Sequence, residues 1–191
     1  MNYQEFLESK TRFQGYHGKQ VSQDDIHPVL FDFQKDLVFW SVKKGRAAIF
    51  ADTGLGKTFM QLEWARLIGG KTLIVAPLSV ASQTIREAKK IDLSVQFSRE
   101  RAEGQFTITN YEMIQNFNPK DFDSVVLDES SILKGIAGKT RKRLNEMFAD
   151  TPYRLCCTAT PAPNDIAEIA NHAEFLGIMS RVDMLSTFFV H

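Results

Sequence analysis

Short apolar runs alternate with longer segments of helical spacing along most of this chain of 191 residues. The apolar runs are continuous and carry no polar alternation, which is typical of strands buried on both faces. Strands of this kind that are separated by helices form a parallel sheet with helices packed on both sides. The sequence therefore predicts an α/β fold of three layers, α/β/α, with a mainly parallel central sheet.

The same pattern sets the domain boundaries. Residues 1–24 are polar with scattered aromatic residues, and we expect a short helix there over residues 3–10. Regular alternation begins near residue 29, so we divide the chain into an N-terminal extension, 1–26, and one domain, 27–191. The expected strands are 46–51, 72–76, 94–97, 106–110, 124–128 and 153–158, and the expected helices are 30–44, 57–68, 80–90, 139–150 and 163–177.

Composition argues against several classes of protein. The formal net charge is zero, so a nucleic-acid partner would have to be held by local contacts. No apolar run reaches the roughly 20 residues that span a bilayer. The N-terminus, MNYQEFLESK, lacks the apolar core of a signal peptide, and we expect a cytoplasmic protein with no membrane partner. Cys156 and Cys157 are neighbours on an expected strand and point to opposite faces, which predicts two buried thiols rather than a disulfide.

The stretch ADTGLGKT, residues 51–58, follows an expected strand and opens an expected helix. It matches the phosphate-binding loop G-x-x-x-x-G-K-[ST], except that Ala51 replaces the first glycine. Lys57 would supply a positive charge to the phosphates of ATP, and the Thr58 hydroxyl would bind Mg²⁺. Backbone N–H groups of such a loop surround the phosphate oxygens, here from Thr53, Gly54, Leu55, Gly56, Lys57 and Thr58. The alternative is a chance glycine-rich turn before a helix.

An acidic pair ends the expected strand in SVVLDESS. Asp128 is placed to hold Mg²⁺, directly or through water. Glu129 is placed to orient or deprotonate an attacking water. An acidic pair alone is weak evidence for a magnesium site, because such residues often only cap a strand or helix. The phosphate loop and the acidic pair both follow strands, and in parallel sheets ligands bind at the carboxyl ends of strands.

Two further features fit the same edge of the sheet. In CTATPAPND, Thr158 and Thr160 place hydroxyl groups at the end of the last expected strand. The alternative there is simple turn chemistry and a helix start near residue 164 or 165. Upstream, Gln34 carries an amide that can donate to and accept from adenine, which would favour ATP over GTP. The alternative for Gln34 is an ordinary solvated glutamine on a helix.

This ordered set resembles the first RecA-like lobe of superfamily 2 helicases, and most closely the Swi/Snf-type DNA translocases of bacteria and phages. The segments that carry the resemblance are Gln34 with its helix, ADTGLGKT, TLIVAPLSV, FTITNYEMI, DESSILKG and YRLCCTATPAPND. Within that family the first glycine of the phosphate loop is often replaced, as at Ala51. One departure is Ser131, where many relatives have a histidine. The resemblance covers roughly residues 27–178.

The resemblance implies a DNA-dependent ATPase that uses ATP and Mg²⁺ at Lys57, Asp128 and Glu129. It implies a partner of nucleic acid, double-stranded DNA above all, and a second RecA-like lobe in cis or in trans, for which this chain has no room. Without that lobe the chain should turn over ATP very slowly. The resemblance gives Thr158 and Thr160 a coupling role, and it places nucleic-acid contacts at Pro77, Ser79, Thr109, Asn110, Tyr111 and Lys134.

Two other function classes stay open at this stage. Another P-loop enzyme, such as a small kinase, would need an acceptor site that the sequence does not display. A nucleotide-dependent interaction module without catalysis is the second alternative. It would have no need of an intact Lys57, Asp128 and Glu129 together.

Overall fold

The computed structural model describes residues 17–134 and 139–189. Its centre is a six-stranded sheet with the strand order β1-β6-β5-β2-β4-β3 within these residues. The strands are β1 (Arg46–Phe50), β2 (Thr72–Ala76), β3 (Val95–Phe97), β4 (Phe106–Asn110), β5 (Ser124–Asp128) and β6 (Tyr153–Thr158). Every neighbouring pair is parallel, so all carboxyl ends lie along one edge of the sheet.

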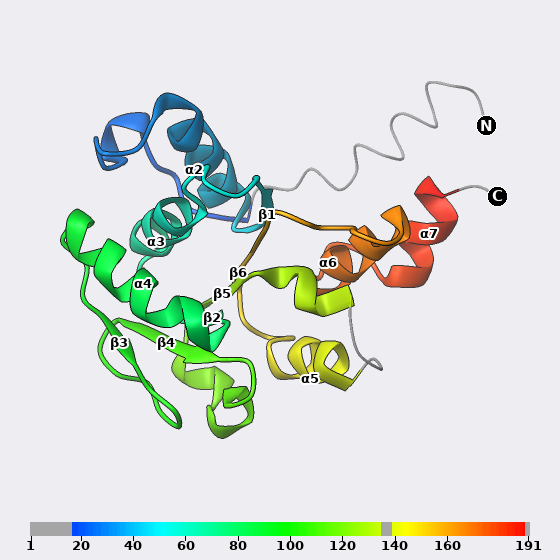
Figure 1. Cartoon of the computed structure of the whole chain (residues 1–191). Coiled ribbons are helices and arrows are strands. Elements are labelled where there is room, and N and C mark those ends of the chain that lie inside the picture. Colours follow the sequence, from blue (N-terminus) through cyan, green and yellow to red (C-terminus); the bar gives the residue numbers. More distant parts are fainter. Residues whose placement is uncertain (1–16, 135–138, 190–191) are drawn as a thin grey trace.

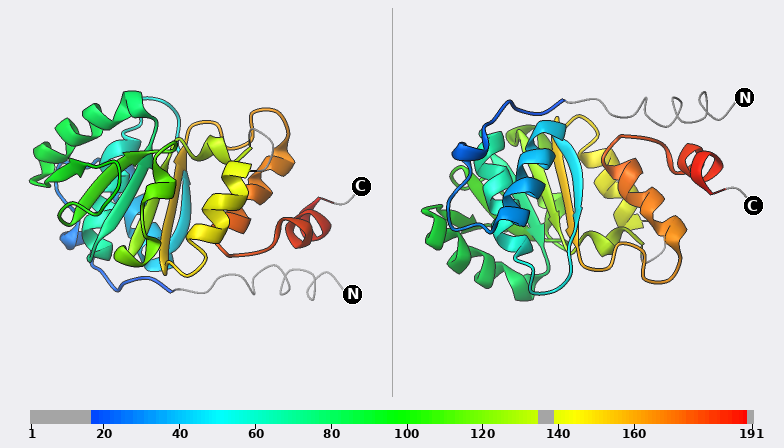
Figure 2. Two further views of the ribbon diagram at one scale, coloured as in Figure 1. Left: turned by 90° about the horizontal axis from the view of Figure 1, so that it is seen from below. Right: turned by 90° about the horizontal axis from the view of Figure 1, so that it is seen from above.

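Helices cover both faces of this sheet (Figure 1). On one face lie α2 (Asp32–Lys44), α3 (Lys57–Ile68) and α4 (Leu78–Ala88), and on the other lie α5 (Lys139–Met147) and α6 (Ile169–Phe175). The two turned views show the same sandwich, with α7 (Arg181–Phe188) set apart from the sheet (Figure 2). Short 3-10 helices complete the chain: η1 (Gln23–Asp25), η2 (Lys89–Ile91), η3 (Ile114–Asn116), η4 (Pro119–Asp121), η5 (Ser130–Lys134) and η6 (Ile166–Glu168).

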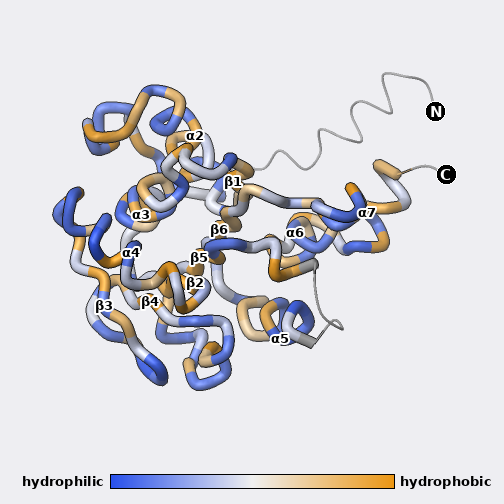
Figure 3. The backbone as a smooth tube through the Cα atoms, viewed as in Figure 1, coloured by the Kyte–Doolittle hydropathy of each residue, from blue (hydrophilic) through white to orange (hydrophobic). Residues whose placement is uncertain are grey.

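The two faces of the sheet have separate hydrophobic cores. Trp64 of α3 and Val38 of α2 are fully buried on one face, while Phe148 and Phe175 lie edge to face in the other core, with ring centroids 6.5 Å apart. Strands β2 and β5 are buried along their whole length, which explains their continuous apolar sequences. Hydrophilic residues predominate on the outer loops (Figure 3).

The two cysteines show the alternation of side chains along β6 directly. Cys157 belongs to the core under α2 and α3, and Cys156 belongs to the core under α5 and α6. Both thiols are free and buried, as the sequence predicts. The predicted fold class, three layers around a parallel sheet, is confirmed, and every strand lies where the apolar runs placed it, with ends that differ by at most one residue.

The expected helix 163–177 is wrong at its beginning. Asp165 has an extended backbone, and its carboxylate accepts a 2.8 Å hydrogen bond from the N–H of Ala167, so η6 starts only at Ile166 and α6 at Ile169. Helix α7 was not expected at all. It begins after Ser180, whose hydroxyl accepts a hydrogen bond from the N–H of Asp183. The expected helix 3–10 lies outside the described residues.

The domain boundary at residue 27 stays a prediction, although part of the proposed extension packs on the domain. The N–H groups of Gly18 and Lys19 donate to carbonyl groups near the end of α2, and Ile26 is buried in the core beside α3. Among the described residues, no helix combines the length and the apolar character needed to cross a membrane.

Candidate nucleotide site at the carboxyl edge of the sheet

The loop between β1 and α3 has the backbone shape of a phosphate cradle. Gly54 and Gly56 have φ values of +84° and +77°, a left-handed conformation that glycine adopts at little cost. Ala51 behaves differently, because its N–H donates to the carbonyl of Thr158 and so continues the sheet by one residue. The replaced first glycine therefore sits at a position that needs no left-handed backbone, as the sequence predicts.

Lys57 lies at the centre of this loop. Its Nζ donates to the carbonyl oxygens of Ala51, at 2.9 Å, and Asp52, at 3.1 Å. The loop residues 52–55 around it are exposed. Among the described residues no side chain caps the N-terminus of α3, and its first turn holds no acidic residue. The first N–H groups of α3 and the Lys57 ammonium group thus form an accessible anion site.

Gln34 supports the phosphate loop from α2. Its side chain is buried, its Oε1 accepts from the N–H of Phe31 at 2.9 Å, and its Nε2 donates to the carbonyl of Leu55 at 2.9 Å. The amide is therefore engaged with the backbone on both of its ends. Recognition of adenine by Gln34 stays a prediction, while the structure adds a role that the sequence did not suggest, which is to hold the loop.

The acidic pair closes the other side of the site. Asp128 is the last residue of β5 and is buried. Burial raises the pKa of its carboxyl group to about 6, while the nearby Gln61 amide, the N–H of Glu129 and the positive charge of Lys57 favour the charged form. The Gln61 side chain is fully buried and its polar atoms make no hydrogen bond of standard geometry among the described residues.

Glu129 is oriented by its backbone and by β6. It has a φ of +52°, and its half-buried carboxylate accepts a long hydrogen bond of 3.4 Å from the Thr158 hydroxyl. The same Thr158 hydroxyl accepts a 3.1 Å hydrogen bond from the N–H of Thr160, whose side chain is exposed. Strands β1, β6 and β5 are neighbours, so Lys57, Glu129 and Thr158 come from adjacent positions on one edge.

The residues present fit a magnesium-bound triphosphate. A buried carboxyl group with an elevated pKa, Asp128, lies near the Lys57 charge and next to a loop of exposed backbone. The half-buried hydroxyl of Thr58, in the first turn of α3, supplies the second oxygen that a magnesium ion would take. Oxygen ligands of this kind suit Mg²⁺, and the ion would balance the charge that Asp128 carries when ionised.

The nucleic-acid residues expected from the resemblance divide into two groups. Ser79 is exposed and Pro77 half-buried directly after β2, on the same edge as the phosphate loop. Thr109, Asn110 and Tyr111 are all buried in this structure, and the expectation that they contact nucleic acid stays a prediction. They end or follow β4 and point into the protein. The side chain of Lys134 lies outside the described part of the chain.

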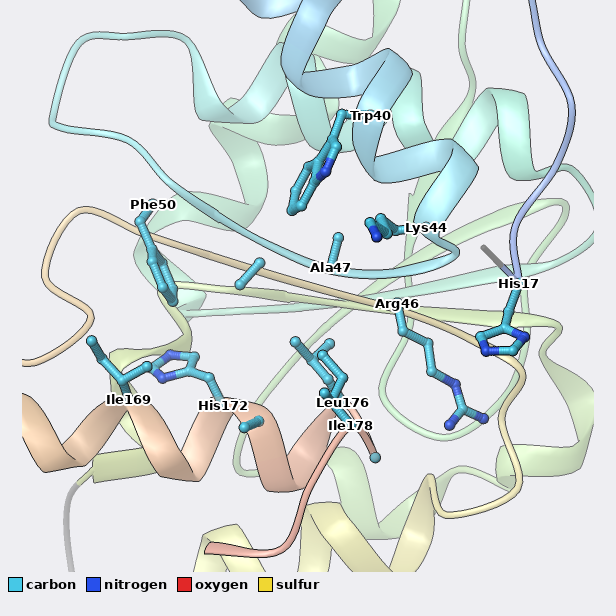
Figure 4. Close-up of a pocket in the computed structure, with 13 residues that line it drawn as sticks. His17, Trp40, Lys44, Arg46, Ala47, Phe50, Ile169, His172, Leu176 and Ile178 are labelled. Carbon is cyan, nitrogen blue, oxygen red and sulfur yellow. The ribbon is translucent and has the colours of Figure 1, made fainter. Parts of the chain in front are cut away.

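A separate cavity of about 530 Å³ lies beside the edge strand β1, with α2 and α6 contributing to its wall (Figure 4). Trp40, Phe50, Leu176 and Ile178 give it an apolar lining, with Lys44 and Arg46 toward one end. None of the loop residues 51–58 and neither acidic residue lines it. It is therefore distinct from the candidate nucleotide site, although His172 in its wall reaches the acidic loop.

Three residues near the site were missed by the analysis of the sequence. Gln61 lies four residues after Lys57 on α3, and that helical spacing could have identified it. Tyr111 was assigned to nucleic acid, yet its hydroxyl donates to the carbonyl of Asp128 at 2.6 Å. His172 contacts Ser130 from α6, and no local pattern in the sequence signals that contact.

No protein-family model matches this sequence, and no curated protein matches it significantly. Solved structures of other proteins share the fold, two of which follow. The SWI2/SNF2 ATPase core of Sulfolobus solfataricus, solved in complex with double-stranded DNA, matches with a TM-score of 0.71 and 20% identity, over 88% of this chain and 40% of that chain. The UvsW helicase of bacteriophage T4 matches with a TM-score of 0.60 and 15% identity, over 94% of this chain and 66% of that one.

This chain therefore spans less than two thirds of the length of either structure. At such identities the likeness establishes the fold. The α/β domain described above has the fold of a lobe of the helicase-related cores to which SWI2/SNF2 ATPases and UvsW belong.

Proposed function

We propose that this chain is the ATP-binding lobe of a DNA-dependent ATPase of the Swi/Snf-type translocase kind. The observation that carries the proposal is the meeting of Lys57, Asp128, Glu129 and Thr158 at one edge of a parallel sheet, beside an uncapped helix N-terminus. Lys57 and the loop amides would hold the phosphates of ATP, and Thr58 and Asp128 would hold Mg²⁺.

Bound Mg²⁺ would neutralise charge on the phosphates as the terminal phosphoryl group departs. The Glu129 carboxylate would orient the attacking water and accept its proton. Thr158, which contacts both Glu129 and the backbone of Thr160, would link this chemistry to the segment that follows β6. A complete motor would take its arginine finger from a second lobe, a contribution worth about 10³–10⁵ in rate in related NTPases.

Duplex DNA is the proposed track. One structure with this fold was solved on double-stranded DNA, and the exposed Ser79, in the first turn of α4 directly after β2, offers a hydroxyl group on the edge of the proposed nucleotide site. Contacts of this kind recognise phosphates rather than bases. Their affinity should fall steeply as salt is raised.

Titration calorimetry with Mg-ATP tests the nucleotide half of the proposal. We expect binding by the wild-type chain and at least about a tenfold loss for Lys57→Ala, which corresponds to about 1.4 kcal/mol. Lys71→Ala is the matched control, because Lys71 is exposed just before β2, at the opposite edge of the sheet. Equal affinity of Lys57→Ala and the control would contradict the proposed site.

The DNA half needs a separate measurement. A duplex-binding titration at two salt concentrations should give a weaker affinity at the higher one, and Ser79→Glu should weaken it further through repulsion of phosphate. If binding is insensitive to salt and to Ser79→Glu, the proposed track on this edge is wrong, whatever the result with ATP.

A further inference from the structure

We propose that Tyr111 and His172 are positioning residues that hold Glu129 in its left-handed backbone conformation and so aim its carboxylate. The proposal rests on the proposed function for the role of that carboxylate. Two hydrogen bonds carry it, one to the residue before Glu129 and one to the residue after it. We refer to Tyr111, His172 and Ser130 together as the clamp.

Glu129 has a left-handed backbone at a place in the chain where such a conformation is unusual. Within the described residues only Asp92 and Glu129 have a positive φ without being glycine. Asp92 ends the 3-10 helix η2, a position where a left-handed residue is ordinary. Glu129 instead follows directly on a buried strand, where a long side chain at φ +52° needs outside support to stay in place.

Tyr111 supplies the first support. Its hydroxyl donates a 2.6 Å hydrogen bond to the carbonyl of Asp128, the group that immediately precedes the Glu129 nitrogen. The bond fixes the orientation of the peptide plane on which the φ of Glu129 depends.

His172 supplies the second support, from helix α6. Its Nε2 lies 3.1 Å from the Ser130 Oγ, and its ring packs edge-on against Phe50 with centroids 5.2 Å apart. Only 2% of the residue is exposed. The ring is thus fixed by β1 and α6, and it anchors the residue directly after Glu129 to that rigid frame (Figure 4).

The clamp and the Thr158 hydroxyl act on different parts of Glu129. The clamp sets the backbone on both sides of Glu129, while the Thr158 hydroxyl contacts the carboxylate itself. If the clamp is removed, the backbone can relax to a common conformation and carry the carboxylate away from its place beside Thr158. Nucleotide binding, which rests on the phosphate loop, should persist.

A stability measurement tests the clamp without any nucleotide. Glu129→Gly and Glu129→Ala both remove the carboxylate, but only glycine tolerates the left-handed backbone. In the wild-type background the glycine variant should melt about 2–4 °C above the alanine variant. That shift corresponds to a difference of about 1 kcal/mol in the free energy of unfolding for a chain of this length. In a Tyr111→Phe/Ser130→Ala background that gap should close, and an unchanged gap would overturn the proposal.

A kinetic measurement tests the consequence. The rate of hydrolysis is measured under single-turnover conditions, with the 191-residue chain in excess over Mg-ATP. Tyr111→Phe and His172→Phe should each slow hydrolysis by about tenfold, because the Glu129 carboxylate is then misplaced in the transition state. Their affinity for Mg-ATP should stay within about threefold of wild type. His172→Gln, which can place a polar atom near the position of Nε2, should recover part of the rate. Tyr153→Phe, at the opposite end of the sheet, is the matched control.

The outcomes separate this proposal from the proposed function. If the wild-type chain fails to bind Mg-ATP, the proposed function is wrong, while the Glu129→Gly and Glu129→Ala comparison still decides whether the clamp exists. If clamp variants lose affinity and rate together, or if hydrolysis is unchanged in them, the positioning role is wrong even though the ATPase is real.

Discussion

The amide nitrogen of Gln34 donates a 2.9 Å hydrogen bond to the carbonyl oxygen of Leu55, at the tip of the phosphate loop. This bond joins α2 to a loop whose own residues are largely exposed. The other end of the same amide accepts from the N–H of Phe31, at the start of α2. A side chain that the sequence suggested as a reader of the base is thus also a brace for the loop that would hold the phosphates.

The brace predicts how Gln34→Ala affects nucleotide selectivity. Loss of loop support should weaken Mg-ATP and Mg-GTP alike, by about tenfold each, equivalent to about 1.4 kcal/mol. Calorimetric titration of both nucleotides measures this. Gln83→Ala, on the exposed face of α4, is a control expected to change neither. A loss of ATP affinity alone would show that Gln34 acts only as a reader of adenine.

Gly56 should be far less replaceable than Gly54. A Cβ added to Gly56 would lie 2.4 Å from Gln34 Nε2, whereas one added to Gly54 meets no described atom within 4 Å. Both have a positive φ, so both alanine variants carry backbone strain, but only Gly56→Ala also displaces the brace. We expect Gly56→Ala to lose more affinity for Mg-ATP and more thermal stability. Adding Gln34→Ala to Gly56→Ala should restore part of the stability, and equal effects at the two glycines would contradict the close packing.

Asp128 predicts a pH-dependent gain in stability on mutation. Its pKa is raised to about 6 by burial, so the folded protein binds the proton more tightly than the unfolded chain does. The contribution of protonated Asp128 to the free energy of unfolding is therefore fully present below the ordinary pKa near 4. This contribution is lost as the pH rises through 6. Asp128→Asn removes this loss, and by the linkage of 1.36 kcal/mol per pKa unit it should be more stable than wild type by roughly 3 kcal/mol at pH 7.

Urea unfolding at pH 4 and pH 7 checks this prediction. The difference between Asp128→Asn and wild type should be near zero at pH 4 and largest at pH 7. Asp121→Asn, at an exposed position in η4, should show no such trend. A variant that is less stable than wild type at pH 7 would mean that the Asp128 carboxylate is well compensated in the protein without a bound ion.

Arg154 should matter for stability rather than for the proposed chemistry. Its guanidinium group donates to the carbonyls of Thr151, Ala149 and Phe175, and so satisfies the chain ends of α5 and α6. Burial lowers the pKa of this arginine to about 10, yet it remains charged at neutral pH. Arg154→Met leaves the buried carbonyls of Thr151 and Phe175 without this donor and should cost about 2–4 kcal/mol. Arg46→Met, a half-exposed neighbour, should cost far less in the same urea titration.

Much of the site follows from the sequence because a parallel sheet places all carboxyl ends together. Three of the expected strands end next to Ala51, at Asp128 and at Thr158. Once these strands were identified, the residues at their carboxyl ends had to lie on one edge of the sheet. That argument uses only apolar runs and the residues that end them. It is insensitive to errors in helix boundaries, such as the late start of α6.

The remaining part of the site depends on contacts between distant segments. The Ser130–His172 bond joins residues 42 apart in the chain, and the bond from Tyr111 to Asp128 joins residues 17 apart. No local periodicity encodes such pairs, because they depend on how α6 and β4 pack against the sheet. Whether Thr109, Asn110 and Tyr111 are exposed at the end of β4 depends in the same way on the neighbouring layers, and all three are buried here.

A crystal structure of this chain with Mg²⁺ and a non-hydrolysable ATP analogue tests the central claim most directly. We predict that the triphosphate lies against the backbone of residues 53–58 with Lys57 Nζ turned from the carbonyls of Ala51 and Asp52 toward the phosphates. We predict the magnesium ion between the Thr58 hydroxyl and the Asp128 carboxylate. A nucleotide bound in the cavity beside Trp40 and Phe50, or one bound with no contact to Lys57 and Asp128, would contradict the account.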